Sequence, residues 1–181
     1  GLGDVYKRQP SSPYNSGESF TVLSNAFTAP ANKHFAGWNT ATNGSGTSYT
    51  AGSSHNITGN VTLYAQWAFN AQYTVTYNAN GGTGTMTDPS SPYYANNSFT
   101  VLANAFTAPT NRHFNGWNTA ANGGGTADTA GSSYTITGNV TLYAQWAFNS
   151  QYTVTYSANG GSGTMTDPSS PYYENSSFTV L

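Results

Sequence analysis

Hydrophobic and polar residues alternate along two segments of this chain. The sequence YTVTY at residues 73–77 places its two tyrosines and its valine on one face and its two threonines on the other. The sequence VTLYAQW at residues 140–146 alternates in the same way, with valine, leucine, alanine and tryptophan together. A period of two residues is typical of β-strands that bury one face. Both segments are therefore predicted to be half-buried strands.

Shorter apolar runs between these segments predict further strands. They lie at residues 98–102 and 113–118, and Gly-, Asn- and Pro-rich turns punctuate the chain at residues 80–82, 88–89 and 122–125. Helical periodicity is nearly absent, and residues 102–106 are the one weak helical candidate. The predicted fold class is therefore mainly β, with little or no helix.

The dipeptide Gly138-Asn139 has the composition of a two-residue hairpin loop. A tight hairpin in that register would put Ile136 opposite Thr141, on the face away from Val140. We expect a crossing connection or a bulge here instead, because either would let both apolar sets face the core.

The whole pattern recurs along the chain. FTVLSNAFTAP at Phe20 returns as FTVLANAFTAP at Phe99, and FTVL returns again at Phe178, with 79 residues between successive copies. A fixed period of this length indicates a repeat array, in which neighbouring repeats of the same chain stabilise one another. The predicted organisation is a truncated repeat at residues 10–67, a linker at 68–72, a complete repeat at 73–146, a linker at 147–151 and a second truncated repeat at 152–181.

The two truncated repeats are complementary. The first lacks a YTVTY segment, and the last contains one at residues 152–156 without the rest of the repeat. We therefore expect the chain to be a piece of a longer protein. We also predict an unpaired sheet edge in the first repeat, which could capture the last segment of another molecule by strand swapping.

Residues 1–9 do not follow the repeat pattern. The segment Asp4–Gln9 looks like a translated reading frame of a transposon-end adapter used in sequencing libraries. We interpret residues 1–9 as a non-native leader and exclude them from fold reasoning. The alternative is a genuine basic leader.

Composition narrows the class of protein. Four Lys and Arg against six Asp and Glu give a formal charge of −2, too little positive charge for a nucleic-acid partner or an anionic membrane surface. No apolar run is long enough to span a bilayer, so direct membrane insertion of this segment is not predicted. Cysteine is absent, so no disulfide stabilises the repeats. Aromatic residues make up 15% of the chain, which favours packed cores over disorder.

Candidate chemistry is sparse. His34 and His113 occupy equivalent positions of two repeats and have no partner at metal-ligand spacing, so each is interpreted as a half-buried strand residue with a hydrogen bond at its edge. Asp88 and Asp167 precede prolines, where aspartate commonly begins a turn. The run Gly81–Thr85 resembles a phosphate loop but lacks its lysine, and a turn is favoured. No catalytic residue, metal site or cofactor is predicted.

Two adjacent tyrosines are the one feature that suggests binding. Tyr93-Tyr94 recurs as Tyr172-Tyr173, and in an extended strand adjacent side chains point to opposite faces. One tyrosine of each pair is therefore expected outside the core, where it could contact a ligand such as a glycan. The alternative, which we favour, is that it merely packs over the loop at residues 80–88.

The motifs resemble the Listeria-Bacteroides repeat family, which is related to the internalin B-type repeats of bacterial surface proteins. The resemblance rests on YTVTYNANGG at residues 73–82, FNGWNT at 114–119, the Gly-rich turn and NVTLYAQW at 139–146, and it covers residues 10–181. It implies small β-grasp-like modules in tandem on secreted or wall-attached bacterial proteins, often beside adhesive domains. Histidine at positions 34 and 113 departs from the aromatic residue that is more common there.

These observations lead to two functional hypotheses. The first is a non-enzymatic stalk or spacer, extracellular at a bacterial cell surface or cell wall, that presents an adhesive or other head domain. The second is a multivalent array in which each repeat binds a glycan or a host or bacterial surface protein weakly. An enzyme is not predicted.

Overall fold

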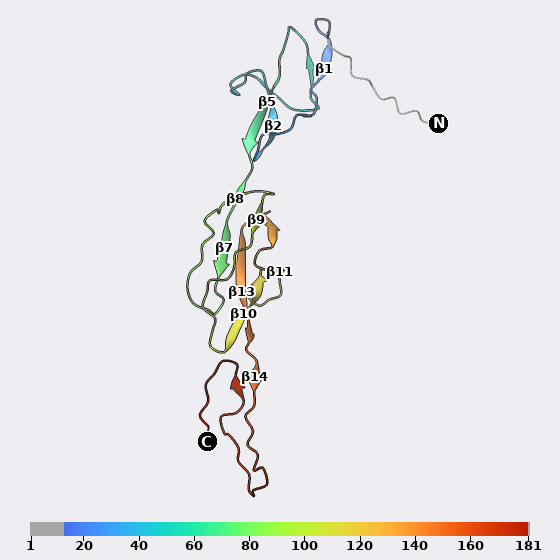
Figure 1. Ribbon diagram of the computed structural model, residues 1–181. Coiled ribbons are helices and arrows are strands. Elements are labelled where there is room, and N and C mark those ends of the chain that lie inside the picture. Colours follow the sequence, from blue (N-terminus) through green and yellow to red (C-terminus); the bar gives the residue numbers. More distant parts are fainter. Residues whose placement is uncertain (1–12, 181) are drawn as a thin grey trace, which may run out of the picture. The chain divides into compact units, whose positions relative to one another are not determined.

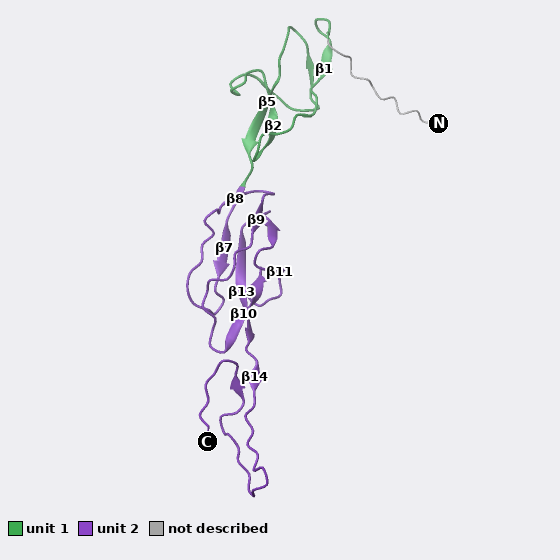
Figure 2. Ribbon diagram, viewed as in Figure 1, with its two compact units in different colours: residues 1–71 green, residues 72–181 purple. Residues whose placement is uncertain are grey.

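The computed structural model describes residues 13–180, and the leader predicted at residues 1–9 lies outside this range. The chain divides into two compact units, Gly1–Ala71 and Gln72–Leu181 (Figure 2). All regular structure in the described residues is β-strand (Figure 1), so the prediction of a mainly β protein is confirmed.

The first unit contains two small sheets. Its strands are β1 (Ser19–Thr21), β2 (Lys33–Asn39), β3 (Ser48–Tyr49), β4 (Ser54–Asn56) and β5 (Tyr64–Phe69). Strands β1 and β4 form an antiparallel pair, and β3, β2 and β5 form a three-stranded sheet in that order.

The second unit contains the same elements and several more. Its strands are β6 (Gln72–Tyr73), β7 (Val75–Asn78), β8 (Tyr93–Tyr94), β9 (Ser98–Thr100), β10 (Arg112–Asn118), β11 (Ala127–Asp128), β12 (Ser133–Thr135), β13 (Val140–Phe148), β14 (Gln151–Tyr152) and β15 (Tyr172–Tyr173). The main sheet has four strands in the order β11, β10, β13, β7. Strand β7 is parallel to β13, whereas the other pairs are antiparallel.

The YTVTY segment divides between two sheets. Strand β6 pairs with β8, and after Thr74 the chain continues as β7 along β13. Thr74 is held at this junction because its N–H donates to Asn139 Oδ1 (2.9 Å) and its carbonyl accepts from Val140 N (3.0 Å). Val75 and Tyr77 then lie 4% and 8% exposed, so the predicted apolar face of this segment is buried.

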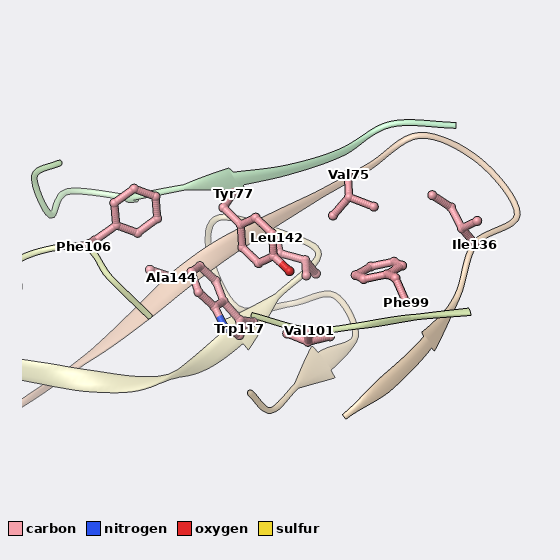
Figure 3. Close-up of a cluster of buried hydrophobic side chains, with 9 residues drawn as sticks. All are labelled: Val75, Tyr77, Phe99, Val101, Phe106, Trp117, Ile136, Leu142 and Ala144. Carbon is pink, nitrogen blue, oxygen red and sulfur yellow. The ribbon is translucent and has the colours of Figure 1, made fainter. Parts of the chain in front are cut away.

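The core of the second unit lies between the main sheet and the antiparallel pair of β9 and β12 (Figure 3). Its buried members are Val75, Tyr77, Phe99, Val101, Phe106, Trp117, Ile136, Leu142 and Ala144. The Trp117 ring makes edge contacts with Tyr77 and Phe114 at centroid distances of 4.9 and 5.0 Å. Its indole N–H donates to the carbonyl of Leu102 (2.9 Å), so the polar atom of this buried ring is satisfied.

The connection at Gly138-Asn139 is a crossing, the first of the two alternatives that the sequence left open. Strand β12 pairs with β9, whereas β13 pairs with β10 and β7, so β12 and β13 do not form a hairpin. Ile136 and Leu142, on either side of this connection, are both 0% exposed. The crossing thus lets both apolar sets reach one core.

The weak helical candidate at residues 102–106 is wrong. This segment is an irregular loop, in which the Asn104 side chain accepts from Phe106 N (3.0 Å) and donates to Phe106 O (3.1 Å). Local side-chain bonds of this kind compete with helical hydrogen bonds. The β-grasp likeness is not confirmed by the observed topology and stays a prediction from the resemblance.

Candidate functional site

The tyrosine pair at residues 93–94 forms strand β8, which pairs with β6 at the start of the complete repeat. Both side chains are half-buried. Tyr93 packs against the core and its ring stacks on Phe99 at a centroid distance of 5.2 Å, whereas Tyr94 is not part of the core cluster. The pair therefore has one member that faces the core, as expected for an extended segment.

The hydroxyl of Tyr93 is engaged within the protein. It donates to the Asp88 carboxylate, with distances of 2.9 Å to Oδ2 and 3.0 Å to Oδ1. Burial, together with the hydrogen bond to Asp88, raises the pKa of Tyr93, so this phenol is a proton donor and not a base at neutral pH.

Asp88 begins a turn, as the sequence predicts. Its Oδ1 accepts from Ser90 N (2.9 Å), and its carbonyl accepts from Ser91 N (3.3 Å). The side chain is only 9% exposed, and its role is to close the turn and hold the Tyr93 hydroxyl.

The same arrangement recurs in the last copy. Tyr172 donates to Asp167 Oδ2 (2.7 Å), Asp167 Oδ1 accepts from Ser169 N (2.9 Å), and the Tyr172 ring lies 5.4 Å from Phe178. The hydrogen bond to Asp167 raises the pKa of Tyr172. Tyr173, like Tyr94, is half-buried. A ligand contact at Tyr93, Tyr94, Tyr172 or Tyr173 stays a prediction.

The histidines differ from their prediction in one respect. His34 and His113 lie on β2 and β10 as expected, yet both side chains are exposed and not half-buried. The predicted edge hydrogen bond is present in each copy, because His34 Nδ1 lies 3.0 Å from Asn70 Oδ1 and His113 Nδ1 lies 3.1 Å from Asn149 Oδ1. These bonds fix the chain just after β5 and β13.

No group of three or more His, Cys, Asp or Glu side chains suited to a metal ion occurs within residues 13–180. The glycine run at 81–85 forms the predicted turn, with Gly82 N donating to Ala79 O (3.0 Å). A Cβ on Gly82 would lie 2.6 Å from Thr107 O and 2.7 Å from Trp146 Cζ2. Glycine is required here because the backbone packs closely against the protein, and not because it approaches a phosphate.

Two buried asparagines organise the Gly-rich loops, and sequence reasoning missed them. Asn118 is 3% exposed; its amide donates to Gly123 O (3.1 Å) and its Oδ1 accepts from Ala120 N (2.8 Å) and Gly125 N (3.0 Å). Asn39 makes the corresponding bonds in the first unit. The signal was present in the repeated Trp-Asn-Thr sequence, whose asparagine follows the buried tryptophan in both copies.

The polar groups described above are satisfied mainly by the fold itself, and the repeated elements are cores, turns and loop anchors. Elements that recur in this way define a repeat module. A family profile described as the Listeria-Bacteroides repeat domain matches residues 3–66 and 73–145. The chain belongs to this repeat family. Because the first match begins at residue 3, within the segment interpreted as foreign, the leader assignment stays a prediction.

Two proteins of Evansella cellulosilytica are similar in sequence. One, named "Putative Gly-rich membrane protein", is 34% identical over 140 residues, which cover 71% of this chain and 15% of that protein. The other, named "Putative membrane protein", is 31% identical over 142 residues, which cover 67% of this chain and 18% of that protein. The chain thus spans less than a fifth of the length of either relative.

No solved structure is significantly similar to this chain. Among residues 13–180, no helix is long and apolar enough to cross a membrane.

Proposed function

We propose that these repeats are a non-catalytic spacer in a bacterial cell-surface protein, which holds a head domain at a distance from the membrane or wall. Membership of the repeat family and the names of the two relatives support a surface location. The internally satisfied polar groups support a structural role, because they leave few groups for chemistry.

The observation that carries this proposal is the parallel pairing of β7 with β13. Val75 begins β7 beside Val140, and β13 continues in the same direction to Phe148. The chain therefore enters the complete repeat near one end of the sheet and leaves it at the other. A module with its two ends at opposite sides adds length each time it is repeated.

The start of each link is also fixed. After β5, Asn70 N donates to Asn32 O (2.8 Å), and after β13, Asn149 N donates to Asn111 O (2.9 Å). The next strands, β6 and β14, follow within three residues. Short, hydrogen-bonded links favour a semi-rigid array over a flexible string.

The length added per copy has an upper bound. Val154 is the repeat equivalent of Val75, so one copy adds the distance between these two residues. Val140 lies beside Val75, and Val154 follows Val140 by 14 residues along the chain. At about 3.3 Å per extended residue, one copy adds at most roughly 46 Å.

Small-angle X-ray scattering on arrays of two, four and six copies of residues 72–150 tests the spacer. We expect the maximum dimension to increase by a constant amount per copy, within that bound. A maximum dimension that grows only as the cube root of mass would show a compact particle and would refute a spacer.

The binding array is the second hypothesis, and it rests on Tyr94 and Tyr173. A Tyr94→Ala, Tyr173→Ala double variant that keeps its folded circular dichroism spectrum but loses binding to a glycan array would favour it. Tyr93→Phe, which alters only an internally bonded hydroxyl, is the matched control.

A further inference from the structure

The first unit contains an apolar groove. Its volume is about 750 Å³, and apolar side chains form most of its lining, among them Phe20, Val22, Leu23, Phe27, Trp38 and Leu63. In the second unit the equivalents of these residues belong to the core or pack against it. The groove therefore lies where the complete repeat has a closed core.

Side chains of the first unit are more exposed than their equivalents in the second unit. Phe27 is 64% exposed, whereas its equivalent Phe106 is 7% exposed. Leu63 is half-buried, whereas Leu142 is 0% exposed. The local sequences are nearly identical, so the difference comes from what packs on them.

In the second unit strand β7 packs beside Leu142. The loop that follows β7 lies against Phe106, where Thr83 and Thr107 exchange backbone hydrogen bonds (3.0 and 2.9 Å). Val75 and Tyr77 of β7 fill the core, and Thr76 Oγ1 lies 2.8 Å from Thr141 Oγ1 on the outer face. Among residues 13–71 no strand pairs with β5 on the corresponding side. Residues 61–63, the equivalents of the start of β13, also lie outside any strand.

The first unit contains the equivalents of the residues that form hydrogen bonds with β7, and with the residue before it, in the complete repeat. Asn139 and Val140, which bind Thr74 in the complete repeat, have the equivalents Asn60 and Val61, and both line the groove. Thr62 stands where Thr141 bonds to Thr76.

A second YTVTY segment is present at residues 152–156. Strand β14 (Gln151–Tyr152) includes only the first residue of this segment, and residues 153–156 lie outside any strand. Tyr152 is 60% exposed. Val154 and Tyr156 are half-buried and Thr155 is exposed, the same alternation as in β7. Its flanking turn is already formed, since Val154 N donates to Ser170 Oγ (3.1 Å) as Val75 N does to Ser91 Oγ (3.0 Å).

We propose that the groove of the first unit binds residues 152–157 of a second copy of this chain as a parallel strand along residues 61–64. The β7–β13 register fixes the pairing, so that Val154 lies beside Val61, Thr155 beside Thr62 and Tyr156 beside Leu63. Val154 and Tyr156 enter the groove, and the tyrosine ring packs on Trp38 as Tyr77 does on Trp117. Backbone hydrogen bonds supply the affinity, and the fit of Val154 and Tyr156 into the groove supplies the specificity, as in β-strand addition generally.

The direction of β13 favours a second molecule over the same one. From Val140, beside the entry strand, β13 runs eight residues to Phe148, roughly 26 Å at about 3.3 Å per residue. The four residues from Phe148 to Tyr152 span at most about 14 Å. A span of about 14 Å is shorter than about 26 Å, so residues 148–152 are too short to return the YTVTY segment at residues 152–156 to the end of the repeat where the chain enters.

Engineered disulfides test the register. The chain has no cysteine, so a Thr62→Cys, Thr155→Cys variant carries a single pair of thiols. The equivalents of these two residues in the complete repeat, Thr141 and Thr76, have their hydroxyl oxygens 2.8 Å apart. Oxidised glutathione accepts the two electrons of the thiol pair as the disulfide forms. We expect disulfide-linked dimers and larger species on a non-reducing gel, at least ten times more than from a Thr62→Cys, Ser157→Cys variant, whose pair is two residues out of register.

Two gel results would overturn the proposal. Equal yields from the two variants would show random collision, and a disulfide confined to the monomer would show that the strand docks within its own chain.

Association of the cysteine-free chain gives an independent test. Light scattering after size exclusion should show a mass that falls from dimer or larger to monomer on dilution. Val154→Asp puts a charge into the groove and should weaken association at least a hundredfold, whereas Thr155→Asp puts the same charge on the outer face and should weaken it less than tenfold. Equal effects, or a wild-type chain that is monomeric at millimolar concentration, would refute strand docking.

A chain that begins at Pro13 completes the test. It lacks residues 1–12 and should associate at least as strongly as the full chain. If association appears only after this truncation, residues 1–12 occupy the groove of the full chain, and the proposal is wrong for it.

Discussion

Phe27 and Phe106 offer an internal comparison of the same side chain in an open and a closed core. Each lies in the sequence Asn-Ala-Phe-Thr-Ala-Pro, and each contacts the tryptophan of its own unit at 6.0 or 6.1 Å between ring centroids. Their exposures nonetheless differ, at 64% and 7%. Phe106→Ala should therefore destabilise the second unit far more than Phe27→Ala destabilises the first.

The magnitude follows from the buried area. A packed aromatic side chain buries about 200 Å², so the difference in exposure corresponds to roughly 115 Å². At about 25 cal/mol per Å², the two substitutions should differ by about 3 kcal/mol. We expect Phe106→Ala to cost about 4 kcal/mol and Phe27→Ala about 1 kcal/mol. The larger cost is close to the whole stability of a domain this size, about 3 to 5 kcal/mol.

Hydrogen exchange measured by mass spectrometry can follow both units in one chain. Peptides that cover β2 and β10 report the free energy of opening of the first and second units separately. The Val154→Asp background prevents a strand from another molecule from covering Phe27 during the measurement. The distant unit in each variant is the control and should not change.

Comparable losses from the two substitutions would refute this reasoning. They would mean that contact with the neighbouring tryptophan, which both residues share, determines the cost and that the remaining burial contributes little. A larger loss from Phe27→Ala would mean that the exposed groove is not the state of the first unit in solution.

Three further outcomes can be measured by urea unfolding. Asn118→Ala should cost about 2 to 4 kcal/mol, because it leaves several backbone groups of the Gly-rich loop without a buried partner. Gly82→Ala should cost about 1 to 3 kcal/mol through overlap with Trp146, whereas its equivalent Gly161→Ala, whose Cβ would meet its nearest atom at 3.2 Å, should cost little. Burial raises the pKa of Asp128 above 3.8, so the folded protein favours the neutral carboxyl group. Stability of the fold is therefore lost as the pH rises through the folded-state pKa and the carboxyl group ionises. Asp128→Asn should thus stabilise the protein at pH 7, by under about 1 kcal/mol for this partly exposed group, and give no gain at pH 3; a gain that is independent of pH would contradict this assignment.

The strand positions were largely accessible from the sequence. The alternation at residues 140–146 located most of β13, and residues 113–118 matched β10 to within one residue at its start. The conflict at Gly138-Asn139 also predicted that residues 133–146 do not form a tight hairpin, and left a crossing or a bulge as the alternatives. These features depend on which side chains must avoid water, a property of neighbouring residues along the chain.

The candidate site was less accessible. The tyrosine pair and the aspartate turn were visible as motifs, but their hydrogen bond was not, because it depends on how the turn that Asp88 begins folds Tyr93 back onto the Asp88 carboxylate. The exposure of His113 was also missed. Alternation places a residue on a face of a strand, but it does not say whether another layer covers that face.

The sequence by itself determined the repeat period, the mainly β class, the core-facing sides of the segments that form β7 and β13, and the absence of disulfides, because each follows from composition or from local periodicity. Only the tertiary structure decided that β7 lies parallel to β13, that Asn118 anchors a loop, and that the first unit has a groove where the second has a core. These features join residues up to 65 positions apart, as Thr74 and Asn139 are joined. Two copies with almost the same sequence can differ in this way because burial depends on the partner strand as well as on the residue itself.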